Sequence, residues 1–155
     1  MGIFVGIDPS LNGTAIISLD SEANIISMEL ISTSSKEVME KRLCLIRDFV
    51  ASFLNKQRPN KVCIEGLSFQ SRGQAMAQLG ALHFILRIFL FQEKLDYRVV
   101  EPTVLKRFVT GKGQGKKELM LKEVYKKWGA DFDDNNLADA YGLARIALED
   151  FRSGN

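Results

Sequence analysis

Histidine and cysteine are almost absent from this chain of 155 residues. The sequence contains one histidine, His83, and two cysteines, Cys44 and Cys63, which lie far apart and form no Cys-x-x-Cys pair. Two such cysteines exclude a disulfide scaffold, and a single histidine cannot complete a zinc site built from cysteine and histidine. We therefore expect both cysteines to be reduced, buried thiols.

Long hydrophobic runs are also missing. The most apolar stretch, residues 84–91, is too short to cross a bilayer, which requires about 20 residues. Residues 1–8 lack the basic start of a signal peptide and soon reach a carboxylate. With 46% hydrophobic and 26% charged residues, the composition is that of a globular protein rather than a disordered or collagen-like chain. We therefore expect a soluble, cytoplasmic protein with no membrane partner, folded as one domain over residues 1–155.

Charge is distributed unevenly, although the formal net charge is only +2. Residues 98–128 include nine basic and three acidic side chains, whereas residues 129–155 include two basic and six acidic side chains. A basic block beside an acidic block is typical of a site that holds a polyanion next to a cation. The alternative is that the lysines of the block cover the solvated face of a helix.

The hydrophobic pattern predicts an α/β fold. Three apolar segments joined by short turns predict an antiparallel meander, and strand and helix patterns alternate after it. This order favours a mixed five-stranded sheet, in which parallel strands join the meander and helices pack on the sheet. The predicted strands are 3–7, 14–19, 25–32, 61–65 and 97–100, and the predicted helices are 36–55, 74–93, 102–109, 116–128 and 136–151.

Three carboxylates and one amide form a candidate metal-binding cluster. Asp8 and Glu65 each end a predicted apolar strand, where a carboxylate is poorly hydrated and needs a partner. Neighbouring strands lie about 4.8 Å apart, so both carboxylates could reach one cation. Asn136 and Asp139, three residues apart, share one face of the last predicted helix. Taken singly, each residue is explained by a turn, a strand end or a helix cap; together they are a set of hard oxygen ligands that favours Mg²⁺ or Mn²⁺.

Such a cluster suits phosphodiester hydrolysis. Two divalent ions roughly 3.5–4 Å apart can activate a water molecule and stabilise the departing 3′ oxygen. Acid–base catalysis without a metal is less favoured, because neither the histidine nor an isolated carboxylate pair stands out.

The ordered motifs resemble those of the RuvC-type Holliday-junction resolvases, which belong to the ribonuclease H-like superfamily, and especially the small bacteriophage-encoded members. The resemblance covers nearly the whole chain and is carried by Gly6-Ile7-Asp8-Pro9-Ser10, Ile64-Glu65, the segment from Lys106 to Lys117, and Ala138-Asp139-Ala140. It implies a ribonuclease H-like sheet with helices on both faces. It also implies a metal-dependent endonuclease that nicks four-way junctions and other branched DNA symmetrically, with two Mg²⁺ ions, or Mn²⁺ in their place, at each site. A phage-encoded member would act in the cytoplasm of its bacterial host.

The resemblance also implies roles for individual residues. The family has a further carboxylate three residues before the last metal ligand, where this chain has Asn136, whose amide oxygen can bind a metal but carries no charge. Three accounts are open: an engineered inactivating substitution, a natural variant, or replacement by Asp133 or Asp134. We favour the first, because an Asp→Asn change preserves shape and removes charge. The implied metal-binding and catalytic residues are Asp8, Glu65, Asn136 and Asp139.

The family's glycine-and-lysine segment is present as Lys106, Gly111, Gly113 and Lys117. Glycines allow close backbone approach and lysines can contact phosphate oxygens; Lys117 is also expected to stabilise charge on the scissile phosphate as a catalytic residue. The alternative is a flexible surface loop. Phe69 approximately matches a family aromatic that stacks on bases at the junction, although it could equally pack against its own protein. The implied DNA-binding residues are Phe69, Arg72, Lys106, Lys112, Lys116 and Lys117.

The predicted helix 74–93 is apolar nearly all round, which one sheet cannot cover. We expect it to form the interface of a homodimer, although the domain's own helices could cover it instead. Two other functions stay open: another ribonuclease H-like nuclease that acts on forks or RNA–DNA hybrids, or a junction-binding protein made catalytically silent by Asn136.

Overall fold

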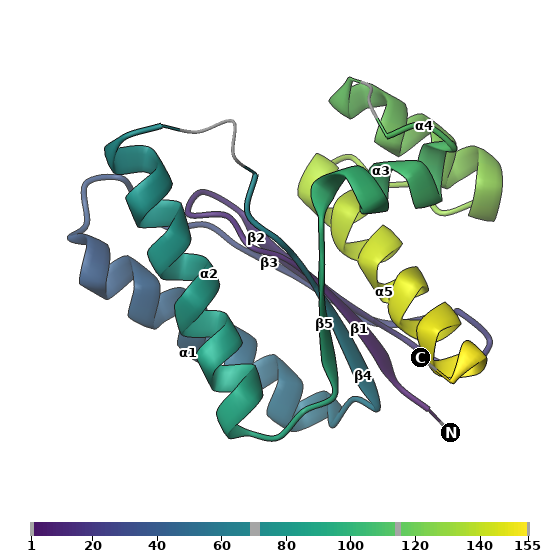
Figure 1. Cartoon of the computed structure of the whole chain (residues 1–155), viewed down its shortest axis with the longest axis horizontal. Coiled ribbons are helices and arrows are strands. Elements are labelled where there is room, and N and C mark those ends of the chain that lie inside the picture. The colour runs from purple at the N-terminus through teal and green to yellow at the C-terminus, as the bar shows by residue number, and fades with distance from the viewer. Residues whose placement is uncertain (1, 69–71, 114–115, 155) are drawn as a thin grey trace.

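A five-stranded mixed sheet forms the centre of the computed structural model, which describes residues 2–68, 72–113 and 116–154 (Figure 1). The strand order is β3-β2-β1-β4-β5. β1 (Phe4–Asp8), β2 (Thr14–Leu19) and β3 (Ile25–Ile31) form the predicted antiparallel meander. β4 (Lys61–Glu65) runs parallel to β1, and β5 (Tyr97–Val100) runs parallel to β4. The predicted α/β class and mixed sheet are therefore confirmed.

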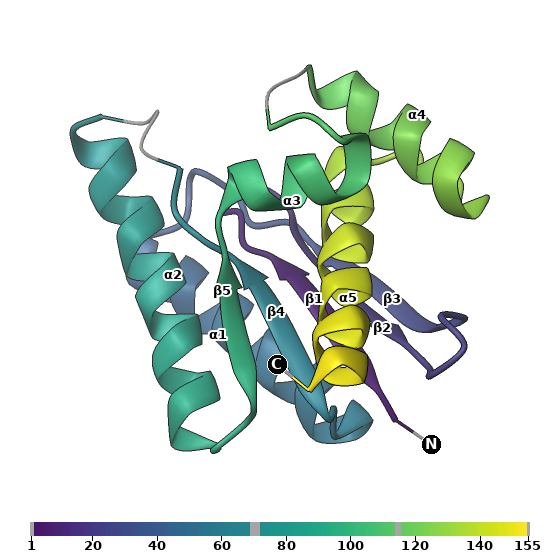
Figure 2. The same ribbon diagram turned by 45° about the vertical axis from the view of Figure 1, so that its right-hand side comes forward.

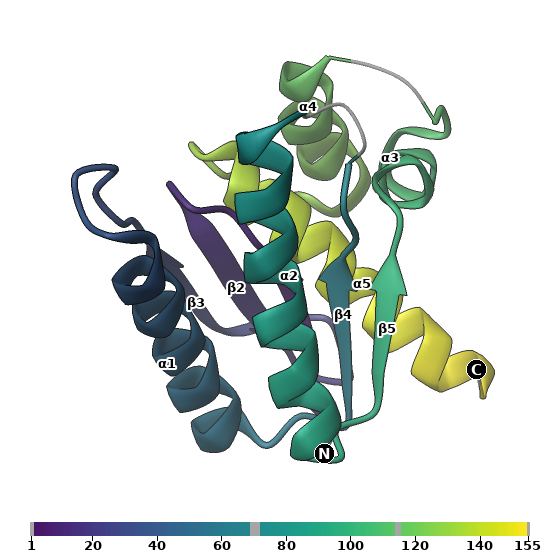
Figure 3. The ribbon, with the colours of Figure 1, turned by 60° about the vertical axis from the view of Figure 1, so that its left-hand side comes forward.

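Helices cover both faces of the sheet (Figures 1 and 3). α1 (Met39–Gln57) and α2 (Gln74–Gln92) lie on one face. α5 (Asn135–Ser153) lies on the other face, with α3 (Pro102–Thr110) and α4 (Lys117–Trp128) packed against it. Side chains of β1 and β4 alternate between these faces and divide the apolar core into two clusters.

The first helix corrects two expectations. α1 begins at Met39 rather than residue 36, because the hydroxyl and carbonyl groups of Ser34 hold the next residues in a turn. Cys44 on α1 is exposed, contrary to the expectation of a buried thiol, because it lies away from the face that Ile46 buries. Cys63 is buried as expected, and burial raises the pKa of its thiol to about 12.

Gly6 allows α5 to lie directly against β1. A Cβ atom at this position would lie 2.0 Å from the carbonyl oxygen of Ala140 and 2.4 Å from the backbone nitrogen of Ala144. Both atoms belong to the backbone of α5 and cannot rotate away. Glycine at position 6 therefore sets the distance between the central strand and the helix that carries Asp139.

The α2 helix has one covered side and one exposed side. Among the described residues it is the one helix that is long and apolar enough, by length and composition, to cross a membrane. A helix that packs on a sheet can have the same length and apolar composition, and α2 packs on one face of this sheet. Its fully buried leucines are Leu82, Leu86 and Leu90. Its most exposed large apolar residues are Phe84 (50%), Ile88 (52%) and Phe91 (73%). The prediction that one sheet cannot cover this helix is therefore confirmed.

Candidate metal centre

Asp8, Glu65 and Asp139 converge at one end of the sheet. Each carboxylate offers an oxygen atom that lies within 4.8 Å of the oxygens offered by the other two. Asp8 is buried, and Glu65 and Asp139 are half-buried. The structure thus brings together three of the four residues that were expected to bind metal, although they lie far apart in the sequence.

Strand register places Asp8 and Glu65 side by side. Gly6 lies opposite Cys63 and Ile7 lies opposite Ile64 in the parallel pair of β1 and β4. The next residues along the two strands are Asp8 and Glu65. Because side chains alternate along a strand, both carboxylates share the face of Cys63, which packs against α5. Two strand ends and one helix are therefore enough to form the cluster.

The N-terminus of α5 positions the third carboxylate. The side chain of Asp134 is the N-cap, and its Oδ1 accepts hydrogen bonds from the backbone N–H groups of Asn136 (2.8 Å) and Leu137 (3.2 Å). Asp139 then follows within the first two turns of the helix. Neither Asp133 nor Asp134 belongs to the carboxylate cluster. The structure thus gives Asp134 a capping role at the start of α5.

Asn136 lies one helical turn before Asp139 and contacts the β1–β2 hairpin. Its side chain is so close to Gly13 that a Cβ atom there would lie 2.9 Å from Asn136 Nδ2. Gly13 comes just before β2, which pairs with the strand that carries Asp8. Asn136 therefore lies on the side of α5 that carries Asp139 and reaches the hairpin that follows Asp8, but it has no negative charge.

The donor set fits a divalent metal ion. Three carboxylates this close repel one another, and the burial of Asp8 limits the relief that water can give. A hard cation compensates this repulsion, and carboxylate oxygens are the ligands that Mg²⁺ and Mn²⁺ prefer. The cluster contains neither histidine nor cysteine, so zinc is disfavoured.

Arg42 was not predicted to have a role, yet it holds the loop that follows Asp8. The buried guanidinium donates to the carbonyl oxygen of Leu11 (3.1 Å), to Asn12 Oδ1 (2.9 Å) and to Thr33 Oγ1 (2.8 Å). These bonds join α1 to the β1–β2 loop and to the segment after β3. The available signal was spacing, because Arg42 precedes the buried Ile46 by four residues and shares its helical face.

His83 lies beside the backbone of Glu65, on the face of the sheet opposite the carboxylate cluster. His83 is 3% exposed, and its ring lies within hydrogen-bonding reach of the backbone of Glu65. Burial lowers the pKa of His83 to about 4, with a further lowering by the positive charge of Arg87 and a smaller opposing effect from the Glu65 backbone. The imidazole is therefore neutral at pH 7 and has one N–H to donate.

Four of the residues expected to bind DNA lie in the described segments around α2, α3 and α4. Lys106 is on α3, Lys112 follows α3, and Lys116 precedes α4; Lys112 and Lys116 are exposed. Arg72 is exposed just before α2. In Figure 2, β4 and β5 run towards α3 and α4, so these helices lie at the same end of the sheet as the carboxylates. Phe69 and the side chain of Lys117 lie outside the described part of the chain.

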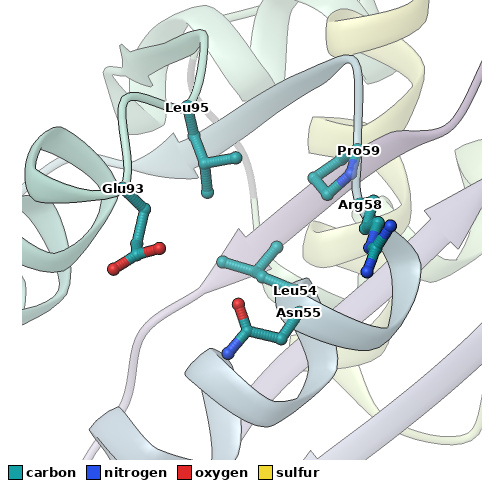
Figure 4. Close-up of a pocket in the computed structure, with 6 residues that line it drawn as sticks. All are labelled: Leu54, Asn55, Arg58, Pro59, Glu93 and Leu95. Carbon is teal, nitrogen blue, oxygen red and sulfur yellow. The ribbon is translucent and has the colours of Figure 1, made fainter.

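A surface pocket of about 330 Å³ lies at the other end of the sheet (Figure 4). Its lining comes from the C-terminal end of α1 and from the segment between α2 and β5. The lining residues are Leu54, Asn55, Arg58, Pro59, Glu93 and Leu95. This pocket includes none of the residues expected to bind metal or DNA.

The sheet order and the carboxylates on β1, β4 and α5 define the class, which is that of ribonuclease H-like, metal-dependent nucleases. Residues 4–146 match the family model described as "Crossover junction endodeoxyribonuclease RuvC". The chain therefore belongs to the RuvC family of metal-dependent endonucleases that resolve Holliday junctions.

Individual relatives agree with this assignment. A crossover junction endodeoxyribonuclease RuvC from Rickettsia rickettsii (strain Sheila Smith) is 28% identical over 151 residues, covering 94% of this chain and 96% of the relative. The structure of Thermus thermophilus RuvC matches with a TM-score of 0.81 at 22% identity and covers 98% of this chain and 96% of its own. A structure of T. thermophilus RuvC in complex with a Holliday junction substrate matches with the same TM-score and identity, covering 99% and 97%. The two structures show that the fold is shared.

Proposed function

We propose that this chain, a single domain over residues 1–155, nicks Holliday junctions symmetrically as a homodimer. The observation that carries the proposal is the convergence of Asp8, Glu65 and Asp139. The relative that matches over nearly its whole length in complex with a Holliday junction supports the choice of substrate. Bacterial relatives support action on DNA in the cytoplasm. The likeness to phage-encoded members, and a phage-infected host as the location, stay predictions from the sequence motifs.

The proposed ligands of two Mg²⁺ ions are Asp8, Glu65 and Asp139, with Asn136 as a neutral fourth ligand; Mn²⁺ can substitute. When bound, the metal supplies an activated water molecule and stabilises the leaving 3′ oxygen. The ends of β1 and β4 present two of the carboxylates, and α5 carries the third to a position where the oxygens of all three lie within 4.8 Å of one another. Lys117 is proposed to stabilise charge on the scissile phosphate.

The test of this function is cleavage of three labelled substrates: a four-way junction, a fork and an RNA–DNA hybrid. We expect preferential, symmetric nicking of the junction with Mg²⁺ or Mn²⁺, and no nicking with EDTA. Preferential cleavage of the fork or the hybrid would overturn the proposed substrate. Tight junction binding without any cleavage would favour the second candidate, a silent junction-binding protein, which the neutral Asn136 one turn before Asp139 on α5 supports.

Restoring a carboxylate at position 136 is expected to strengthen metal binding. Asn136→Asp adds a negative charge one turn before Asp139, and we expect Mn²⁺ to bind about 10-fold to 100-fold more tightly, with faster junction cleavage. Calorimetric titration with Mn²⁺ and single-turnover cleavage measure the two effects. Asn55→Asp is the matched control, because it adds the same charge at an exposed position near the C-terminal end of α1, at the other end of the sheet. Equal Mn²⁺ affinity in Asn136→Asp and the unmodified chain would count against an inactivating role for Asn136.

The exposed side of α2 is the proposed dimer interface. Its residues recur at steps of four, three, four and three, which is the spacing of a helix–helix seam. They are Ala77, Ala81, Phe84, Ile88 and Phe91, and all are exposed in the single chain. A second copy of α2 would cover this stripe and set two metal centres in symmetric positions, as two nicks in a junction require.

Ile88→Lys is expected to convert the dimer into a monomer, because it places a charge in the middle of the apolar seam. We expect the dimer dissociation constant to rise by at least about 100-fold, measured by sedimentation or light scattering over a concentration series. Leu45→Lys is the matched control, since Leu45 is a similarly exposed leucine (44%) on α1. Dimerisation of Ile88→Lys at its original affinity contradicts the proposed interface.

Junction binding is expected to weaken steeply with salt, because the basic segment around α3 and α4 is proposed to contact phosphates. Replacing both Lys112 and Lys116 with alanine is expected to reduce the slope of log affinity against log salt concentration by about 2. Lys56→Ala is the control, since this exposed lysine lies in the last turn of α1, near the other end of the sheet. An unchanged slope in the double variant would remove both lysines from the DNA interface.

A further inference from the structure

The backbone of Glu65 is directed towards β1. The N–H of Val62 donates to the carbonyl of Asp96 (2.9 Å), and the N–H of Gly66 donates to the carbonyl of Val100 (2.8 Å). The even-numbered residues of β4 and the residue that follows it therefore form their backbone hydrogen bonds with the β5 side. Backbone N–H and C=O groups point in opposite directions at successive residues of a strand. The odd-numbered residues of β4, Glu65 included, face β1.

Pro9 interrupts the ladder at this point. Ile7 lies opposite Ile64, so the next residues, Asp8 and Glu65, lie opposite each other. In a parallel pair, a carbonyl accepts from the N–H of the residue that follows its opposite partner, which for Glu65 is residue 9. That residue is Pro9, which has no N–H to donate. A buried carbonyl left without a donor is unfavourable, so another group must supply the hydrogen bond. The ring of His83 lies within hydrogen-bonding reach of the Glu65 backbone and has an N–H to offer.

His83 reaches Glu65 from the face opposite the metal centre. It lies on α2 beside the fully buried Leu82 and one turn before Leu86, in the cluster that fills the α1 and α2 side of the sheet. The carboxylate of Glu65 is on the α5 side, with Asp8 and Asp139. His83 is thus placed to hold the peptide of Glu65 while leaving its carboxylate available to metal. Its Nδ1 has no hydrogen-bond partner among the described residues, which assigns the donor as Nε2.

We infer that His83 is a positioning residue for the metal centre: it replaces the N–H that Pro9 lacks and fixes the strand end that presents Glu65. The inference rests on the proposed function, because it takes Glu65 to be a metal ligand. It predicts that metal affinity depends on the hydrogen bond that His83 donates, and not only on the apolar packing around its ring.

The test is Mn²⁺ binding to the full chain without DNA, measured by calorimetric titration. His83→Leu removes the donor, and we expect Mn²⁺ to bind about 10-fold more weakly. His83→Gln offers its amide nitrogen near the place of Nε2 and is expected to recover most of the affinity. Leu86→Ala is the control, because it creates a cavity in the same cluster and lowers stability without touching Glu65.

A second substitution makes the test specific. Pro9→Ala restores a backbone N–H opposite the carbonyl of Glu65, so it is expected to rescue Mn²⁺ binding in the His83→Leu background. If His83→Leu does not fold, His83→Gln and His83→Asn provide the comparison, since the shorter asparagine cannot reach the carbonyl. Equal Mn²⁺ affinity in these two variants would overturn the inference.

Two outcomes separate this inference from the proposed function. Failure of the unmodified chain to bind Mn²⁺ would overturn both. Normal Mn²⁺ binding by the unmodified chain and by a folded His83→Leu variant would overturn the positioning role alone and leave the proposed function intact.

Discussion

Asp8→Asn is expected to reduce metal-dependent cleavage of a four-way junction by at least about 10³-fold. Asp8 is the most buried member of the cluster, and its replacement leaves two charges where three lay within 4.8 Å of one another. A metal centre contributes several kcal/mol of transition-state stabilisation, and each 1.36 kcal/mol is about tenfold in rate. Junction affinity measured in EDTA is expected to stay unchanged, because the basic segment, not Asp8, is proposed to contact the phosphates.

Single-turnover cleavage with saturating enzyme separates this effect from weaker binding. Asp131→Asn is the matched control, because Asp131 is an exposed carboxylate outside the cluster. We expect this control to cut at the rate of the unmodified chain. Cleavage by Asp8→Asn within tenfold of that rate would show that the carboxylate cluster is not the catalytic centre.

Gly6→Ala is expected to lower the free energy of unfolding by about 3 kcal/mol or more. The added methyl group would lie 2.0 Å from the backbone carbonyl oxygen of Ala140 on α5. Because a backbone atom cannot rotate away as the end of a side chain can, the whole helix must move. Movement of α5 also withdraws Asp139 from Asp8 and Glu65. We therefore expect Mn²⁺ affinity to fall even under conditions in which the variant is fully folded.

Urea denaturation and Mn²⁺ titration measure the two consequences of Gly6→Ala. Gly80→Ala is the control, because a Cβ atom at this helical position meets no atom within 4 Å. We expect this control to be neutral or to stabilise the chain by up to about 1 kcal/mol. Unfolding of Gly6→Ala at the same urea concentration as the unmodified chain would contradict the close contact between β1 and α5.

The metal centre was predictable because its signals are local. A carboxylate at the end of an apolar strand is visible without coordinates at Asp8 and Glu65, and the helical pattern around Asp139 is equally clear. The meander was predictable for the same reason, since short turns leave few ways to connect three strands. The resemblance to a known family then predicted how the strands and the last helix are arranged in one sheet-and-helix fold.

The supporting groups were not predictable, because each depends on contacts between distant segments. The hydrogen bond proposed between His83 and Glu65 depends on the strand register that puts Pro9 opposite the Glu65 carbonyl. Helical spacing places Arg42 on the buried face of α1, but it does not reveal the partners of Arg42, which lie 30 and 31 positions earlier. The roles proposed for Lys117 and Phe69 involve DNA, and they stay predictions.

If α2 faces a partner subunit on one side and the strand that carries Glu65 on the other, it links two equilibria, dimer formation and metal binding. If α2 forms the dimer and His83 holds Glu65, association of subunits and occupancy of the ion site share a coupling free energy, and each changes the other by the same factor. Divalent ions would then tighten the dimer, and dilution would release them. Such reciprocity would keep isolated subunits from nicking one strand of a junction before the opposite strand is engaged.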